Sequence, residues 1–284
     1  RQGLHPPRSV TRTNDNQLKL KAQHLMSSPE HQPSTTDAHG CLQLQGFNAV
    51  IVGNGAIGSA LLDNLLANPG LNRAVILGRR PHEMSEHARA GFVRFDALEP
   101  DSISSAAAAV GQLFDRLHLL INTVGMLHSS QQQPEKRLRD VSAQNLQQSF
   151  MTNAVLLPLL AQAFGPMMRH TDPAVLASLS ARVGSIADNR LGGWYSYRTA
   201  KAAHNMLLQT LSREWSLSHR NVSVVALHPG TVESRLSTPF ISRGYDKRVL
   251  SPSESAAALL TVISGLRPGS SGEFYDWRGD NIPW

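Results

Sequence analysis

A glycine-rich turn directly after a buried apolar run is the feature that most limits what this chain can fold into. The run Ala49-Val-Ile-Val52 leads into Gly53-Asn-Gly55-Ala-Ile57-Gly58, and helical spacing of apolar residues continues to Leu66. In a strand–turn–helix unit, the first glycine of G-x-G-x-x-G allows a tight turn, and the second lets the backbone approach a pyrophosphate. The third lets the helix pack on the strand, and helix N-terminal N–H groups bind phosphate. The pattern predicts a dinucleotide site at Gly53, Gly55, Ile57 and Gly58.

Short apolar runs alternate with helical patterns along the rest of the chain. Such alternation predicts βαβ units, and hence a parallel sheet covered on both faces. The expected fold is an α/β, Rossmann-type, doubly wound parallel sheet of about seven strands in a three-layer α/β/α arrangement, spanning residues 46–284. We expect strands at 49–52, 74–77, 92–95, 117–121, 174–179, 222–227 and 273–275, and helices at 57–66, 102–113, 145–168, 197–218 and 253–265.

Residues 1–45 have a different composition from the rest. They are polar, contain several prolines and show no apolar period of 3.6 or 2, so we expect a disordered tail, with Met26 as a candidate start of translation. An apolar stretch typical of a secretory signal is missing from this segment.

Composition excludes several classes of function. The net charge of +6 comes from scattered basic residues, so we expect no nucleic-acid partner. No apolar run reaches the roughly 20 residues needed to span a bilayer, and we expect no membrane association. The single cysteine, Cys41, excludes an internal disulfide framework and suits a cytoplasmic location. The histidines are scattered without an H-x-x-x-H pattern, so no metal site is expected.

The end of the second expected strand indicates which dinucleotide binds. An NAD site usually has an acidic residue about 20 residues after the glycines, for the ribose 2′-hydroxyl. Here the strand ends Leu77-Gly78-Arg79-Arg80. Arginine pairs bidentately with phosphate, so Arg79 and Arg80 favour NADP(H) over NAD(H). The alternative is that both are ordinary surface arginines.

A Tyr-x-x-x-Lys pair, Tyr197 and Lys201, lies at the start of an expected helix. The spacing i, i+4 puts both side chains on one helix face. A phenol has an ordinary pKa of about 10, and a nearby ammonium lowers it. Tyr197 is therefore our candidate for the general acid/base, with Lys201 lowering its pKa. Tyr195 lacks such a partner, because Thr199 lies four residues further on.

Together, these motifs resemble the short-chain dehydrogenase/reductase family over residues 46–284. The resemblance implies hydride transfer between a nicotinamide and a carbonyl or alcohol, with Tyr197, Lys201 and Asn153 as catalytic residues. It also implies that Lys201 holds the nicotinamide ribose. The segments Val183-Gly-Ser-Ile186 and Gly192-Gly-Trp-Tyr-Ser-Tyr-Arg198 look most like the C-factor-like branch. Further cofactor contacts implied by the resemblance are Asp96, Asn122, Gly125, Pro229, Gly230 and Val232.

The family's catalytic serine has no clear counterpart. It normally lies three residues before a glycine, and counting back from Gly184 gives Ala181. Ser180 is our preferred substitute and Ser185 the alternative, while local turn hydrogen bonding by both serines stays open. A second function therefore stays open too, namely a dinucleotide-binding regulatory or signalling protein with little or no turnover.

The resemblance also implies partners. We expect a small-molecule carbonyl substrate whose identity the sequence does not specify. We also expect a homodimer or homotetramer formed through the helices at 145–168 and 197–218.

Overall fold

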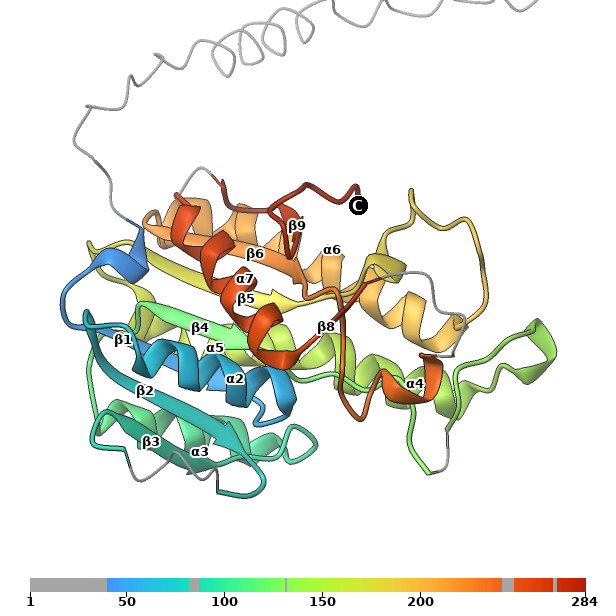
Figure 1. Cartoon of the computed structure of the whole chain (residues 1–284), viewed down its shortest axis with the longest axis horizontal. Helices are drawn as coiled ribbons and strands as arrows, with labels where there is room; N and C mark the ends of the chain where they lie inside the picture. Colours follow the sequence, from blue (N-terminus) through green and yellow to red (C-terminus); the bar gives the residue numbers. More distant parts are fainter. Residues whose placement is uncertain (1–39, 82–86, 131, 242–247, 268–269) are drawn as a thin grey trace, which may run out of the picture. The chain divides into compact units, whose positions relative to one another are not determined.

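The computed structural model describes residues 40–81, 87–130, 132–241, 248–267 and 270–284. Seven strands form one parallel sheet in the order β3-β2-β1-β4-β5-β6-β9 (Figure 1). The order reverses direction at β1 and β4, which is where doubly wound sheets bind their ligands. The strands are β1 (Phe47–Val52), β2 (Leu71–Gly78), β3 (Ala90–Arg94), β4 (Leu119–Asn122), β5 (Ala174–Leu179), β6 (Val222–His228) and β9 (Phe274–Asp276).

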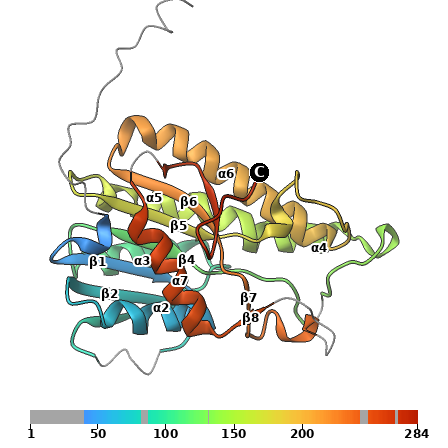
Figure 2. The same cartoon turned by 45° about the horizontal axis from the view of Figure 1, so that its top comes forward.

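Helices cover both faces of the sheet, so the expected three-layer fold is confirmed. One face carries α2 (Ala56–Leu66) and α7 (Pro252–Gly265), which lie side by side in Figure 2. The other face carries α3 (Pro100–Gly111), α4 (Ala143–Phe150), α5 (Leu156–Met168) and α6 (Tyr195–Ser218). Alternate residues of β1 face opposite layers: Val50 and Val52 pack on one side, Ala49 and Ile51 on the other. Burial on both faces explains why the strands read as continuous apolar runs.

The long helix expected at 145–168 is divided. It begins at Ala143, where the N-cap Ser142 Oγ accepts a hydrogen bond from Asn145 N at 3.1 Å, and a π-helical turn, Met151–Val155, separates α4 from α5. The combined run Ala143–Met168 is long and apolar enough to cross a membrane by length and composition, and half of its most apolar window is buried within the domain. That burial is what a core helix shows.

The folded domain begins before the expected boundary at residue 46. A 3₁₀ turn, Cys41–Gln43, contacts α7, and Cys41 and Leu42 are buried in the apolar cluster of that layer. Burial also raises the pKa of the Cys41 thiol to about 12. Residues 40–45 therefore belong to the domain and not to the expected tail, because two apolar side chains suffice to anchor them. Residues 1–39, including Met26, lie outside the described residues.

Short elements at the carboxyl ends of the strands were not expected from the sequence. They comprise a two-stranded parallel sheet of β7 (Thr231–Val232) and β8 (Val249–Leu250), and 3₁₀ turns at Leu138–Asp140, Arg182–Gly184 and Thr238–Phe240. Helix α3 begins at Pro100, two residues before its expected start at 102, and Glu99 is its N-cap.

Candidate active site

The turn between β1 and α2 has the geometry that the glycine pattern predicts. Gly53 has φ +101°, a left-handed conformation that L side chains rarely adopt. A Cβ on Gly58 would lie 1.9 Å from the Gly53 carbonyl oxygen, so the helix can pack here only if residue 58 is glycine. Gly55 is the N-cap of α2, and a Cβ there would enter open space. The N-terminus of α2 therefore has an open approach, as a bound pyrophosphate requires. Ile57 is half-buried in the first turn of this helix.

The two arginines follow β2 at the same edge of the sheet. Arg79 and Arg80 are exposed, and among the described residues their side chains make no hydrogen bond or ion pair. The side-chain amide of Asn54, in the glycine-rich turn, donates to the Arg80 carbonyl oxygen. This bond ties the β2 end to the phosphate turn and leaves both guanidinium groups available to an anion.

Asp96 lies at the end of the neighbouring strand and is half-buried. Its Oδ1 accepts a hydrogen bond from Leu98 N at 3.1 Å, and its own N–H donates to Ser102 Oγ at 2.8 Å. The carboxylate therefore has a structural role in the turn before α3.

The turn after β4 brings three of the expected site residues together. The buried Asn122 accepts from Val124 N at 3.1 Å and donates to Ser178 Oγ at 3.0 Å, which shapes the turn. A Cβ on Gly125 would lie 3.4 Å from Asn153 Oδ1 and 3.7 Å from Lys201 Nζ. Gly125, Asn153 and Lys201 thus meet although they come from three distant segments.

Asn153 lies in the π-helical turn, and such turns often occur at functional sites. Its side-chain amide accepts from Met126 N at 2.9 Å and donates to Met126 O at 2.9 Å and to Ser149 O at 3.0 Å. Asn153 therefore fixes the loop after β4 directly. Its expected catalytic role stays a prediction.

Tyr197 and Lys201 are both buried, on one face of α6. Lys201 Nζ donates to Leu179 O at 2.9 Å and lies 5.9 Å from the centre of the Tyr197 ring. Burial lowers the pKa of Lys201 to about 8 and raises the pKa of Tyr197 well above its ordinary value. Burial alone accounts for the raised pKa of Tyr197 in this structure, and the expected lowering by Lys201 stays a prediction.

Both candidate serines are buried and have structural partners. Ser180 Oγ donates to Asn205 Oδ1 at 2.6 Å, and Ser185 Oγ accepts from Asp188 N at 3.1 Å. Ser178 lies on the same strand face as Ser180, 2.7 Å from His204 Nε2. Burial and the Lys201 charge lower the pKa of His204 to about 3, so this histidine is neutral. The Ser178 and Ser180 hydroxyls join the end of β5 to α6, whereas that of Ser185 bonds within its own loop. The catalytic assignment of Ser180 or Ser185 stays a prediction.

The segment that holds Pro229, Gly230 and Val232 starts at the carboxyl end of β6, and its cofactor contacts stay a prediction. The carbonyl oxygen of Pro229 accepts from Ser255 Oγ at 2.8 Å, and Gly230 has φ +80°. Val232 is buried in β7, paired with Leu250.

The sequence does not predict that an aromatic group forms beside Tyr197. The Trp194 ring centre lies 6.4 Å from that of Tyr197 and 5.3 Å from that of Phe240, with edge-on geometry in both pairs. The His128 ring also packs edge-on with Phe240, at 5.6 Å between ring centres, and its Nε2 donates to Arg235 O at 3.1 Å. No sequence signal shows that these rings meet, because they come from three separate segments.

A second missed residue is Glu135, in a segment that reads as a plain polar loop. Its side chain is buried against the start of α6 and accepts a hydrogen bond from Ser196 N at 3.1 Å.

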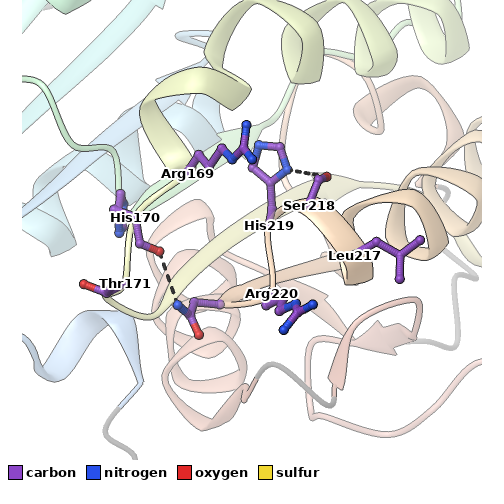
Figure 3. A pocket seen from close by; sticks show the side chains of 8 residues that line it. Arg169, His170, Thr171, Leu217, Ser218, His219 and Arg220 are labelled. Carbon is purple, nitrogen blue, oxygen red and sulfur yellow. Dashed lines mark hydrogen bonds between the residues drawn. The ribbon is translucent and has the colours of Figure 1, made fainter.

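The opposite edge of the sheet carries a shallow pocket of about 400 Å³ (Figure 3). It is lined by residues 169–171 and 217–221, which immediately precede β5 and β6. The cofactor residues expected from the sequence come after the carboxyl ends of strands. The residues that line this pocket come before the amino ends of β5 and β6. It is therefore separate from the candidate active site.

Near that pocket, His118, His170 and Asp172 place three possible metal-ligand atoms within 4.8 Å of one another. His118 Nδ1 accepts a hydrogen bond from Asn48 N at 3.1 Å, so the neutral ring carries its proton on Nε2. That Nε2–H faces Asp172 Oδ2 at 3.5 Å, and Arg116 Nη1 lies 3.0 Å from the same oxygen. Hydrogen-bond donors already surround the carboxylate, which makes the cluster an ion-pair network.

Comparison with known proteins identifies the family. A family model described as short chain dehydrogenase matches residues 48–243. The chain belongs to this family. C-signal of Myxococcus xanthus is 34% identical over 147 residues, which cover 52% of this chain and 83% of that protein. An uncharacterized oxidoreductase of Schizosaccharomyces pombe is 26% identical over 250 residues, covering 82% of this chain and 95% of that one.

Solved structures of short-chain dehydrogenases agree with this assignment. NADPH-bound carbonyl reductase from chicken fatty liver has a TM-score of 0.74 at 29% identity, covering 85% of this chain and 100% of that chain. Carbonyl reductase Sniffer of D. melanogaster has the same TM-score at 23% identity, covering 84% and 100%, and so supports the fold alone. The resemblance drawn from the sequence is confirmed. As a short-chain dehydrogenase, the protein is an oxidoreductase that binds a nicotinamide dinucleotide.

Proposed function

We propose that the protein reduces a small-molecule carbonyl compound with NADPH, and that Tyr197 donates the proton. The observation that carries this proposal is the buried Tyr197–Lys201 pair on one face of α6. A phenol whose pKa is raised by burial stays protonated at neutral pH, which is the form that a proton donor to a carbonyl oxygen needs.

The described residues fit a nicotinamide dinucleotide phosphate. The open N-terminus of α2 at Gly55 would hold the pyrophosphate, and the exposed Arg79 and Arg80 would hold a 2′-phosphate. Lys201 would hold the nicotinamide ribose. When bound, the cofactor supplies the hydride and its two electrons to the carbonyl carbon.

The protein's own residues would manage the proton. Tyr197 Oη would give its proton to the carbonyl oxygen, so that the substrate becomes an alcohol and Tyr197 a phenolate. Lys201, with a pKa of about 8, would return a proton to Tyr197 and regain one from solvent. Trp194 and Phe240 would form an apolar wall for the body of the substrate.

The test is a screen of small aldehydes, ketones and quinones for NADPH oxidation. Turnover of at least one compound that Tyr197→Phe abolishes would support the proposal. Tight NADPH binding without turnover across the panel would contradict it.

A second candidate function rests on Ala181, whose methyl group stands where the family's serine is expected. Without that hydroxyl, the substrate carbonyl loses one hydrogen-bond donor. The alternative is therefore a dinucleotide-binding regulatory protein with little turnover, and the negative outcome of the same screen would favour it.

We also propose a homodimer or homotetramer formed through α4–α5 and α6. Apolar side chains on these helices are exposed, including Phe150 at 44%, Met151 at 54% and Met206 at 64%. Light scattering on the purified protein tests this, and a monomer at micromolar concentration would contradict it.

A further inference from the structure

Helix α6 begins without a cap of its own. Its N-cap residue is Trp194, which has φ 53° and ψ 43° and makes no side-chain capping bond. N-cap positions favour Ser, Thr, Asp or Asn, because their oxygens accept from the free N–H groups of the first turn. Another part of the chain must therefore supply these acceptors.

Glu135 supplies them from 61 residues away in the sequence. Its side chain is 2% exposed, and its Oε2 accepts from Ser196 N at 3.1 Å. Its Oε1 accepts from Ser196 Oγ, and its main-chain oxygen accepts from Trp194 N. One residue thus takes three hydrogen bonds from the first residues of α6. An acidic side chain at this helix end also interacts favourably with the helix dipole.

The cap adjoins the proposed proton donor. Ser196 directly precedes Tyr197, and Trp194 contacts the Tyr197 ring edge-on. A left-handed conformation is unfavourable for a non-glycine residue. The hydrogen bond from Trp194 N to Glu135 helps to hold that conformation, and the Trp194 ring therefore stays beside Tyr197 and Phe240.

We propose that Glu135 is a positioning residue for Tyr197, acting through Ser196 and the main chain of Trp194. It fixes the start of α6 and hence the position of the Tyr197 hydroxyl, without contacting the substrate. The proposal rests on the proposed function, since Tyr197 is taken as the proton donor.

The kinetic test compares Glu135→Ala, Glu135→Gln and Ser196→Ala with Lys136→Ala, an exposed neighbour in the same loop. Because small misplacements of reacting groups cost up to about a hundredfold, Glu135→Ala should lower kcat about tenfold to a hundredfold. KM and the Kd for NADPH should stay within about twofold, since ground-state binding is untouched. Glu135→Gln keeps polar atoms for both Ser196 groups and should recover most of kcat, and Lys136→Ala should match the wild type.

A double variant tests whether Glu135 acts through Ser196. Adding Ser196→Ala to Glu135→Ala should lower kcat little further, because both substitutions remove the same hydrogen bond between the Ser196 hydroxyl and Glu135. A fully additive loss would contradict the proposed route.

Hydrogen exchange at residues 195–198 provides a readout that does not depend on turnover. Loss of the cap should speed exchange of the Ser196 amide about tenfold or more in Glu135→Ala, and not in Lys136→Ala. If no carbonyl substrate is found, the proposed function fails. Hydrogen exchange at Ser196 then still shows whether Glu135 caps α6. Wild-type kcat in Glu135→Ala, or unchanged exchange at Ser196, would overturn the proposal. If Glu135→Ala does not fold, Ser196→Ala, which removes the hydroxyl that bonds to Glu135, replaces it in the comparison and should lower kcat by a smaller factor.

Discussion

Lys201 Nζ is held at 2.9 Å by the carbonyl oxygen of Leu179, the last residue of β5, and lies 5.9 Å from the Tyr197 ring centre. A sheet end and a helix face thus fix the ammonium together. Burial then acts in opposite directions on the two groups, lowering the pKa of Lys201 and raising that of Tyr197. Both shifts favour the uncharged forms.

Because Lys201 is buried, we expect it to lower the free energy of unfolding. A pKa lowered from 10.5 to about 8 penalises the protonated form by about 3 kcal/mol, partly offset by about 1 kcal/mol from the hydrogen bond to Leu179. Lys201→Met should therefore be more stable than the wild type by about 2 kcal/mol at pH 7. Urea denaturation measures the difference, and a less stable variant at pH 7 would contradict the account.

The direction in which this stability difference changes with pH follows from proton linkage. Between pH of about 8 and 10.5, the unfolded chain holds a proton on Lys201 that the folded chain has lost, so stability from this group rises with pH. The advantage of Lys201→Met should shrink as the pH is raised from 7 to 9.5, in the same urea experiment. An advantage that grows with pH would refute the lowered pKa.

The rate of carbonyl reduction should fall at alkaline pH. Loss of the Lys201 proton above about pH 8 removes the group that returns a proton to Tyr197. The kcat of reduction should therefore fall above about pH 8, when measured with saturating NADPH and substrate. A kcat that keeps rising to pH 9.5 would exclude this role of Lys201.

NADPH should bind more tightly than NADH. Replacing Arg79 and Arg80 by Ala removes a charge-assisted contact worth about 1.5–3 kcal/mol, or about tenfold to a hundredfold in Kd. NADH affinity should hardly change, because NADH lacks the 2′-phosphate. Fluorescence titration of both cofactors against wild type and double variant measures this, and equal wild-type affinities would refute the NADP preference.

The serine question has its own test. Ala181→Ser restores a hydroxyl at the place where the family has one, and one added hydrogen bond to a developing oxyanion should raise kcat about tenfold or more. Ser180→Ala instead breaks the bond to Asn205, and should mainly lower the melting temperature. A variant Ser180→Ala that is fully stable but inactive would show that Ser180 is catalytic after all.

Strands and the phosphate turn were predictable from sequence because their signals are local. The apolar runs of β1, β5 and β6 and the glycines at 53 and 58 specify their own geometry. The division of the long helix was not predictable, because Met151–Val155 contains no proline or glycine. Its π turn is instead stabilised by the contact of Asn153 with Met126, a distant residue.

The site's supporting residues depend on contacts between distant segments. Glu135 caps a helix that starts 60 residues later, and Phe240 packs on Trp194 across the site. The direction of the Tyr197 pKa shift likewise depends on burial, which spacing alone does not specify. The Tyr-x-x-x-Lys spacing identifies two residues that lie close together, but tertiary packing sets their pKa values.

Comparison of Tyr197→Phe with Tyr195→Phe tests the central claim most directly. Only the Tyr197 hydroxyl is proposed to donate a proton, and general acids contribute about 10²–10⁴-fold, so Tyr197→Phe should lower kcat by that factor with NADPH binding nearly intact. Tyr195 lies outside the Tyr-x-x-x-Lys spacing, and Tyr195→Phe should keep most of the activity. A wild-type rate in Tyr197→Phe, on any carbonyl substrate that the screen identifies, would contradict the mechanism.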